Sequence, residues 1–297
     1  MMYYNENTFM YLNGQVVKAS DAKIDLYSQT LHYGYGVFEG IRSYRTVTGA
    51  TKIFKEQEHF ERLQHSAQAM NMPYPWDSNE LIRAAYEVLA RNQLADAYIR
   101  PLVYAPANMS FSPNSESFIA IEAWEMKPFL GERLLRVMTS SFERPNPRGC
   151  RIEAKATGHY VNSILASQEA KANGFDEALL CDMDGFVAEA PGANIFLERE
   201  GKLLTPARGN ILPGITRATV FDICASLHVE VVEKQITPGE LARAESAFFC
   251  GTAAEIIGIA SIDGNAFPRA WPGTLGATIE KTYQDLVREK ITLEVFV

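Results

Sequence analysis

Residues 176–206, DEALLCDMDGFVAEAPGANIFLEREGKLLTP, decide the fold of the C-terminal half of the chain. Four short strand-like runs follow one another, with Asp184-Gly185 between the first two and Gly201 between the last two. An Asp-Gly pair between such runs is a strong hairpin signal, because both positions accept the positive φ of a tight turn. The stretch therefore predicts two successive β-hairpins in a strand-rich domain.

Helices and strands flank these hairpins without a regular βαβ alternation. The patterns predict helices over residues 159–173, with Gly174 as the stop, and over residues 215–228. Further strands are expected at 134–141, 229–234 and 246–251. An irregular mixture of this kind is typical of α+β architecture.

The N-terminal half predicts strands at residues 9–17, 36–46, 51–54, 97–105 and 118–124. A helix over 55–71 places Phe60, Leu63, Ala67 and Met70 on one face, and a second helix over 78–92 starts at a Ser78 cap. Pro128 and Gly131 mark a connection. We expect a small α/β domain over 1–125, an interdomain loop over 126–134 and a larger strand-rich domain over 135–297.

Composition excludes several classes of function. A net charge of −8 without a basic stripe argues against nucleic-acid binding. Longer apolar runs are broken by Gly and Glu, so no membrane span is expected, and the first residues lack an export-signal pattern. The four scattered cysteines fit free thiols in a reducing cytoplasm, and neither they nor the five histidines have metal-ligand spacing. We expect a cytoplasmic protein without a metal.

The stretch EAKATGHY, residues 153–160, contains a candidate nucleophile, Lys155. A lysine attacks carbonyl groups when burial or a nearby cation disfavours its ammonium form. Ala154, Ala156 and Gly158 would leave room for a planar cofactor, and Tyr160 adds a phenol. The common alternative is a solvated lysine paired with Glu153.

Glu189, on the second strand of the first hairpin, is a candidate partner for a ring nitrogen. Strand alternation puts Val187 and Glu189 on one face, opposite Phe186, Ala188 and Ala190. An exposed strand carboxylate is the ordinary alternative.

Two Gly-containing turns are candidate anion sites. In NILPGITRAT, Gly214 leads into a helix whose first N–H groups would face an anion, with the Thr216 hydroxyl nearby. The alternative is a Thr-capped helix without a ligand. Thr252 in CGTAAE marks a second such turn, and neither turn has a nucleotide-binding glycine pattern.

The aromatic and glycine-rich stretch LHYGYGVFEGIRSY, residues 31–44, is consistent either with a pocket wall or with hairpin packing.

Together these stretches resemble the branched-chain aminotransferases, fold-type IV enzymes that use pyridoxal 5'-phosphate (PLP). The resemblance covers most of the chain, and its blocks occur in order: HYGYGVFEGIR, EHFERL, AYIRPL, EAKATGHYVNS, DGFVAEAPGANIF, NILPGITR and FFCGTAAEI. It implies a small α/β domain, a larger pseudo-barrel domain, and transamination of L-leucine, L-isoleucine and L-valine with 2-oxoglutarate.

The resemblance also implies roles for single residues. Lys155 would hold PLP covalently and carry the proton, Glu189 would pair with the ring nitrogen, and Tyr160 would bind the phenolate oxygen. Leu212 would pack on the ring. The phosphate would be bound by Arg62, Ile215, Thr216 and Thr252.

For the substrate, the resemblance implies an apolar pocket with polar donors at one end. Its residues would be Phe38, Tyr98, Arg100, Phe129, Thr252 and Ala253, with Tyr33, Met109 and Phe111 supplied by a neighbouring subunit. A homodimer or higher oligomer follows, acting on amino acids and 2-oxo acids.

One departure concerns the interdomain loop, where Met126 stands in place of the family's tryptophan, Lys127 adds charge and Phe129 keeps an aromatic ring. The alternatives with the same fold are a D-amino acid or (R)-amine transaminase and an aminodeoxychorismate lyase. A non-catalytic PLP-binding protein is an alternative of another class.

Overall fold

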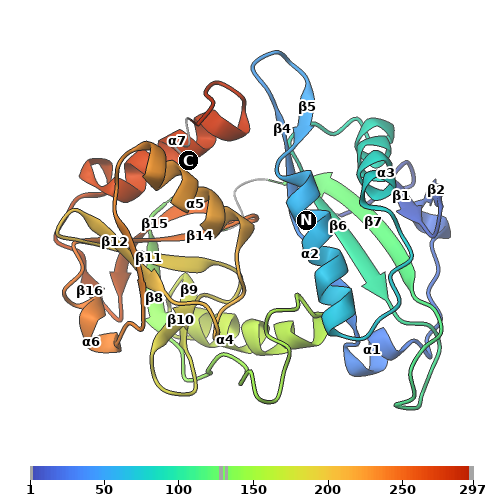
Figure 1. The fold of residues 1–297 in the computed structure, drawn as a ribbon, viewed down its shortest axis with the longest axis horizontal. Helices are drawn as coiled ribbons and strands as arrows, with labels where there is room; N and C mark the ends of the chain where they lie inside the picture. The colour runs from blue at the N-terminus through green and yellow to red at the C-terminus, as the bar shows by residue number, and fades with distance from the viewer. Residues whose placement is uncertain (1–2, 127–129, 131–132, 294–297) are drawn as a thin grey trace. The chain divides into compact units, whose positions relative to one another are not determined.

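The computed structural model describes residues 3–126, 130 and 133–293. The chain forms two compact units, one of Met1–Met126 with Glu153–His159 and one of Lys127–Ile152 with Tyr160–Val297 (Figure 1). The segment that contains Lys155 therefore packs with the first unit, although it lies far along the chain. The domain limits expected from the sequence stay a prediction.

The first unit is built on a seven-stranded sheet in the order β2-β1-β7-β6-β4-β5, with β3 also paired to β6. Its strands are β1 (Phe9–Leu12), β2 (Gln15–Lys18), β3 (Gly36–Phe38), β4 (Ile41–Arg45), β5 (Thr51–Ile53), β6 (Ala97–Tyr104) and β7 (Phe118–Glu125). Its helices are η1 (Ala19–Asp21), α1 (Gln29–Tyr33), α2 (Glu56–Ala69) and α3 (Ser78–Arg91), with η2 (Thr157–His159) in the later segment.

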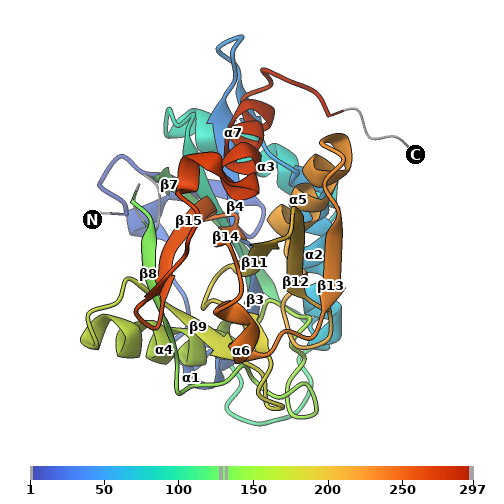
Figure 2. The same cartoon turned by 90° about the vertical axis from the view of Figure 1, so that its left-hand side faces the viewer.

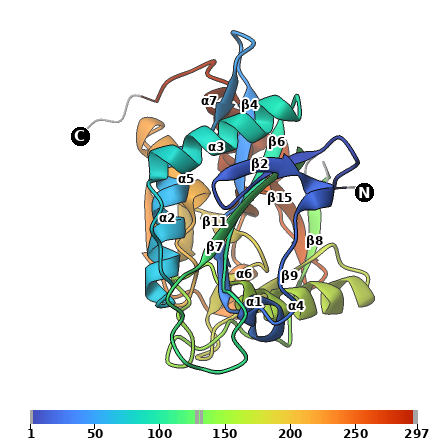
Figure 3. The ribbon, with the colours of Figure 1, turned by 90° about the vertical axis from the view of Figure 1, so that its right-hand side faces the viewer.

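Helices α2 and α3 pack on this sheet (Figure 3). Phe60, Leu63 and Ala67 of α2 are fully buried, as their spacing predicts, whereas Met70 caps the helix and is only partly buried. The predicted Ser78 cap of α3 is wrong by one residue. Asp77 is the cap, because its carboxylate accepts hydrogen bonds from the N–H groups of Asn79 and Glu80.

The second unit contains a nine-stranded sheet in the order β10-β9-β8-β15-β14-β11-β12-β13, with β16 on β15. Its strands are β8 (Leu135–Thr139), β9 (Glu177–Cys181), β10 (Val187–Glu189), β11 (Asn194–Arg199), β12 (Lys202–Pro206), β13 (Val231–Lys234), β14 (Ser246–Gly251), β15 (Glu255–Ile262) and β16 (Asn265–Ala266). Its helices are α4 (Tyr160–Ala172), α5 (Ile215–Ser226), α6 (Pro238–Leu241), η3 (Trp271–Gly273) and α7 (Leu275–Val287), and Figure 2 shows α7 beside β15.

A pairing between β10 and β11 closes six of these strands into a ring, since β10 is also bonded to β9 at the other end of the path. The closing pair is Glu189 opposite Asn194. Both predicted hairpins are present, with Gly185 at φ +81° and Gly201 at φ +73° in their turns. The expected strand-rich barrel is confirmed.

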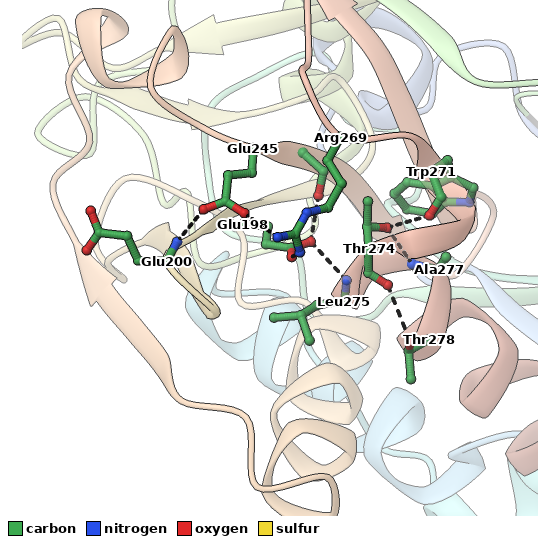
Figure 4. Close-up of polar contacts among 10 residues, drawn as sticks. Glu198, Glu200, Glu245, Arg269, Trp271, Thr274, Leu275, Ala277 and Thr278 are labelled. Carbon is green, nitrogen blue, oxygen red and sulfur yellow. Dashed lines mark hydrogen bonds and ion pairs between the residues drawn. The ribbon is translucent and has the colours of Figure 1, made fainter.

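A buried ionic cluster attaches α7 to this barrel (Figure 4). Glu198 of β11 is fully buried and accepts hydrogen bonds from Arg269, the Ser246 hydroxyl and the Leu275 N–H. Arg269 also pairs with Glu245 at 2.8 Å. The first turn of α7 is thus held by a carboxylate, which its helix dipole favours.

Candidate active-site residues in the two units

Lys155 lies on a backbone that the first unit fixes on both sides. Its N–H donates to the Ser66 hydroxyl at 3.0 Å, and its carbonyl accepts from the Phe38 N–H at 3.0 Å. The ammonium nitrogen lies 4.9 Å from the centroid of the Phe38 ring, within cation–π range. The lysine is partly buried. Its backbone is held in place by hydrogen bonds to β3 and α2.

The small residues around Lys155 pack closely against the first unit. Ala154 and Ala156 are buried, and Ala156 belongs to the hydrophobic core of the unit. The Gly158 N–H donates to the Gly34 carbonyl, and a Cβ on Gly34 would lie 2.6 Å from the Gly158 Cα. Backbone and core packing thus require small side chains at these positions, while their role beside a cofactor stays a prediction.

Arg62 forms part of a buried triad that the sequence analysis missed. Its Nε and Nη2 donate to the two Glu39 oxygens at 2.6 and 2.9 Å, and His59 Nδ1 donates to Glu39 at 2.7 Å. Burial alone would raise the pKa of the fully buried Glu39, but the charge of Arg62 and the hydrogen bonds from Arg62 and His59 hold it well below its usual range. Burial also lowers the pKa of His59, so the imidazole is neutral near pH 7. Glu39 therefore fixes one edge of the Arg62 guanidinium.

A second cluster on β3, β6 and β7 surrounds Arg100 with aromatic rings. Its guanidinium carbon lies 4.5 Å from the Phe38 centroid, 5.2 Å from that of Tyr98 and 5.9 Å from that of Trp124. Arg100 Nη2 also donates to the Tyr98 hydroxyl at 3.2 Å. A guanidinium among apolar rings can bind a carboxylate next to an apolar group.

Trp124 was not predicted as a site residue. It stands directly opposite Tyr98 in the β6–β7 pair, with ring centroids 5.1 Å apart. Its place in the expected strand at 118–124 was the available signal, but the register that pairs it with Tyr98 could not be read from the sequence. The cluster therefore contains a tryptophan, although Met126 replaces the tryptophan expected in the interdomain loop. Phe129 and Lys127 lie outside the described residues.

Tyr33, Met109 and Phe111 form a separate, exposed group. The Tyr33 hydroxyl donates to the Met109 carbonyl at 3.3 Å, and the Tyr33 and Phe111 rings lie 5.5 Å apart. Phe111 is 90% exposed. Large aromatic side chains are rarely left in water in this number without a partner surface.

In the second unit, Glu189 is buried and accepts three hydrogen bonds. The donors are Arg144 Nη2 at 2.9 Å, Asn194 Nδ2 at 2.9 Å and the Leu212 N–H at 3.0 Å. A bulge places Val187 opposite Cys181 but Glu189 opposite Leu180. Because neighbouring residues of a strand face opposite sides, Val187 and Glu189 do not share a face, and the alternation predicted from the sequence is wrong here.

The start of α5 has no side-chain cap. Gly214 is the N-cap and offers no side-chain oxygen to the helix, so the alternative of a Thr-capped helix is wrong. Ile215 and the buried Thr216 are its first helical residues. Uncapped N–H groups at such a terminus favour negative charge. A Cβ on Gly214 would lie 2.1 Å from Asn194 Oδ1, which requires glycine at this position.

The remaining predicted residues occupy turns and helix starts of the second unit. Leu212 precedes α5 and is bonded to Glu189 through its N–H, Tyr160 is the first residue of α4, and Thr252 and Ala253 lie in the turn between β14 and β15. Glu255, which ends this turn, has φ +55°. Within the part of the chain that the structure describes, no cluster of potential metal ligands and no helix long and apolar enough to cross a membrane is found.

Comparison with known proteins identifies close relatives over nearly the whole chain. The sequence description of the family "Amino-transferase class IV" matches residues 36–262. The chain is 40% identical to a branched-chain-amino-acid aminotransferase of Pseudomonas aeruginosa, over 95% of this chain and 93% of that protein. It is 36% identical to the enzyme of the same name from Escherichia coli K12, over 86% and 85%.

Solved structures of branched-chain aminotransferases are also similar to this chain. A branched-chain aminotransferase from Thermoproteus uzoniensis with norvaline superposes with a TM-score of 0.91 at 38% identity, covering 95% of each chain. The branched-chain aminotransferase from E. coli superposes with a TM-score of 0.92 at 33% identity, covering 96% of each.

Proposed function

Because the chain belongs to the class IV aminotransferases, with their fold-type IV architecture, we propose that it is a PLP-dependent transaminase of branched-chain amino acids. It would transfer the amino group of L-leucine, L-isoleucine and L-valine to 2-oxoglutarate, giving the branched 2-oxo acids and L-glutamate. The relatives named above support the substrate class.

One observation supports this proposal most directly. The Phe38 ring has the Lys155 amine 4.9 Å from its centroid and the Arg100 guanidinium 4.5 Å from it. A nucleophilic amine, an apolar ring and a carboxylate-binding cation thus lie side by side in one unit. Leucine and glutamate both need the amine, leucine uses the apolar surface, and the second carboxylate of glutamate uses the cation.

Side chains of the second unit fit PLP. An uncapped helix start suits a phosphate, and a buried carboxylate with three donors suits a protonated ring nitrogen. When bound, PLP supplies the electron sink that makes the substrate Cα–H acidic. A solved relative from Thermobaculum terrenum is described in its PLP form.

We assign the residues to that cofactor as follows. Lys155 Nζ would hold it covalently and would move the proton at the substrate Cα, while Glu189 would accept a hydrogen bond from the ring nitrogen. Tyr160 donates to the phenolate oxygen and Leu212 packs on the ring. The phosphate is bound by Arg62, Ile215, Thr216 and Thr252.

The substrate pocket would combine Phe38, Tyr98, Arg100, Thr252 and Ala253, to which we add Trp124. Such apolar walls separate side chains that differ by one methylene by only about 1–3 kcal/mol. The enzyme should therefore accept leucine, isoleucine and valine, with rates that differ by no more than about 10–200-fold.

A second copy of the chain is the proposed partner. Tyr33, Met109 and Phe111 are exposed in the first unit, and α4 exposes Val161, Ile164 and Leu165 in the second. Apolar side chains exposed in groups mark interaction surfaces. We propose a homodimer in which Tyr33, Met109 and Phe111 complete the site of the partner.

We also propose the cytoplasm as its location. All four cysteines are free thiols, and burial raises the pKa of the Cys224 thiol to about 12. Inert free thiols suit a reducing compartment.

The deciding experiment is a panel of amino donors with 2-oxoglutarate as acceptor, followed by L-glutamate formation. L-Leucine, L-isoleucine and L-valine should each support turnover. Turnover with D-alanine or (R)-1-phenylethylamine alone would replace the proposal by one of the transaminase alternatives. Release of pyruvate from aminodeoxychorismate, without any transamination, would identify the lyase.

A further inference from the structure

Glu189 occupies the residue pair that closes the barrel, and two side chains hold it there. The carboxylate is 5% exposed and lies opposite Asn194 in the β10–β11 pair. Arg144 and Asn194 each donate to it at 2.9 Å, one to each oxygen. Neither was expected to belong to the site.

Arg144 brings a full positive charge to a carboxylate that water barely reaches. Its backbone N–H is bonded to the Cys181 carbonyl at 2.8 Å, which anchors the loop beside β9, and its side chain is only 9% exposed. Its Nε is buried without a hydrogen-bond partner among the described residues. A buried N–H group without a hydrogen bond costs free energy. The position of the guanidinium therefore favours its ion pair with Glu189 over hydrogen bonding of all its own N–H groups.

Asn194 orients the same carboxylate. Its Nδ2 donates to Glu189 Oε2 and to the Leu212 carbonyl at 3.2 Å, while the Leu212 N–H donates to Glu189 Oε1. Glu189, Asn194 and Leu212 thus form a closed ring of hydrogen bonds. Since Asn194 Oδ1 also lies against Gly214, this ring connects the carboxylate to the turn that starts α5.

We propose that Arg144 and Asn194 are positioning residues that act through Glu189. Arg144 stabilises the anionic form of the buried carboxylate before any cofactor is present, and Asn194 fixes its orientation. A cofactor ring nitrogen then meets an acceptor that is already ionised and aligned. This inference rests on the proposed function, because it concerns the same ring-nitrogen contact.

The test compares two cofactors that differ only at the ring nitrogen. PLP and its 1-deaza analogue, which has C–H in place of that nitrogen, are titrated into the full-length apoprotein, and the ratio of their dissociation constants is measured. The wild type should prefer PLP by about 10-fold or more, as expected for a hydrogen bond to a charged group. Arg144→Met and Asn194→Ala should reduce this ratio to near that of Glu189→Gln.

Two further variants make the comparison sharper. Adding Arg144→Met to Glu189→Gln should change the ratio no further, because Arg144 acts through Glu189. Arg148→Met, an exposed arginine of the same loop, should keep the wild-type ratio.

An unchanged ratio in Arg144→Met, with both cofactors weakened equally, would leave Arg144 a purely structural residue and overturn the inference, and so would a larger ratio. If Arg144→Met does not fold, Arg144→Lys replaces it. Lysine keeps the charge, so most of the ratio should survive, and a ratio as low as that of Glu189→Gln would contradict the charge argument. A wild type that binds neither cofactor would instead refute the proposed function, and one that binds both equally would refute the role of Glu189.

Discussion

Lys155 is positioned by its backbone. The Ser66 hydroxyl and the Phe38 N–H hold the peptide groups on its two sides, and the buried Ala156 anchors the next residue in the core. Fixing the backbone leaves only the flexible side chain to order. An amine held in this way can reach a carbonyl repeatedly with little entropic loss on each cycle.

Reduction with borohydride should trap the cofactor on Lys155. A peptide map of the treated enzyme should show the modified lysine at position 155, and not at the exposed Lys171 of α4. Lys155→Arg should lose turnover by at least about 10²–10⁴-fold, since arginine keeps the charge but does not shuttle protons. Lys171→Arg should behave as wild type, and an unmodified Lys155 would refute its assignment.

How far the sequence predicted single residues depended on what each residue contacts. Lys155, Glu189 and the α5 start were predicted from the family resemblance, because each local pattern alone also fits a surface residue or an ordinary helix cap. Glu39, Arg144 and Asn194 were missed, since each becomes informative only through a partner 23, 45 or 5 residues away. Chain separation of this kind leaves no trace in local periodicity.

Among the elements, α2 shows how a helix can combine core packing with charge. Phe60 and Leu63 face the core, while His59 and Arg62 meet Glu39. The neutral, buried His59 makes the stability of this helix dependent on pH.

The pKa of His59 is lower in the folded protein than in the unfolded chain, so the unfolded chain binds its proton first. Stability is then fully present above about pH 6.5 and falls as the pH drops below it, by at most about 1.4 kcal/mol per pH unit from this group. Glu39, whose pKa is also lowered, adds a further loss below about pH 4.5. His59→Gln should reduce the change in the urea midpoint between pH 7 and pH 5. His65→Gln, at an exposed position of the same helix, should leave that pH dependence as in the wild type.

The ionic cluster at the start of α7 should carry measurable stability. Arg269→Met leaves the fully buried Glu198 with only the Ser246 and Leu275 donors. We expect a loss of about 2 kcal/mol, below the roughly 3–5 kcal/mol typical of a broken buried pair, because Arg269 is itself 44% exposed. Urea unfolding would measure the loss, and Arg243→Met, at an exposed position, is the control. Equal urea midpoints for Arg269→Met and the wild type would show that the ion pair adds no stability.

Most elements were predictable, and the exceptions have physical causes. The two hairpins follow from turns that contain Gly185 and Gly201, because glycine readily takes the positive φ that each turn requires. The bulge before Glu189 was not predictable. An inserted residue changes the side of the sheet that the following side chains face, but it leaves the apolar pattern of the sequence unchanged. Strand β15 and helix α7 were not predicted at all.

At the scale of the whole molecule, the exposed apolar groups predict self-association. Phe111→Asp and Ile164→Asp should each shift the protein toward monomer, since a carboxylate in an apolar interface must be desolvated. Sedimentation velocity over a range of concentrations would measure the shift. Leu227→Asp changes an exposed apolar residue at the end of α5 and should leave the assembly intact. A wild type that is monomeric at all concentrations would contradict the proposed dimer.

The first unit is discontinuous in sequence, because residues 153–159 belong to it while the residues on both sides belong to the second unit. The chain therefore passes between the units three times. A fragment that stops at Met126 would contain Phe38, Arg62 and Arg100 but would lack Lys155 and the core residue Ala156. The first unit could therefore not be cloned, exchanged with a relative or inherited by itself as a continuous piece of gene without losing part of its interior, and a piece that covers the second unit would always carry a segment of the first.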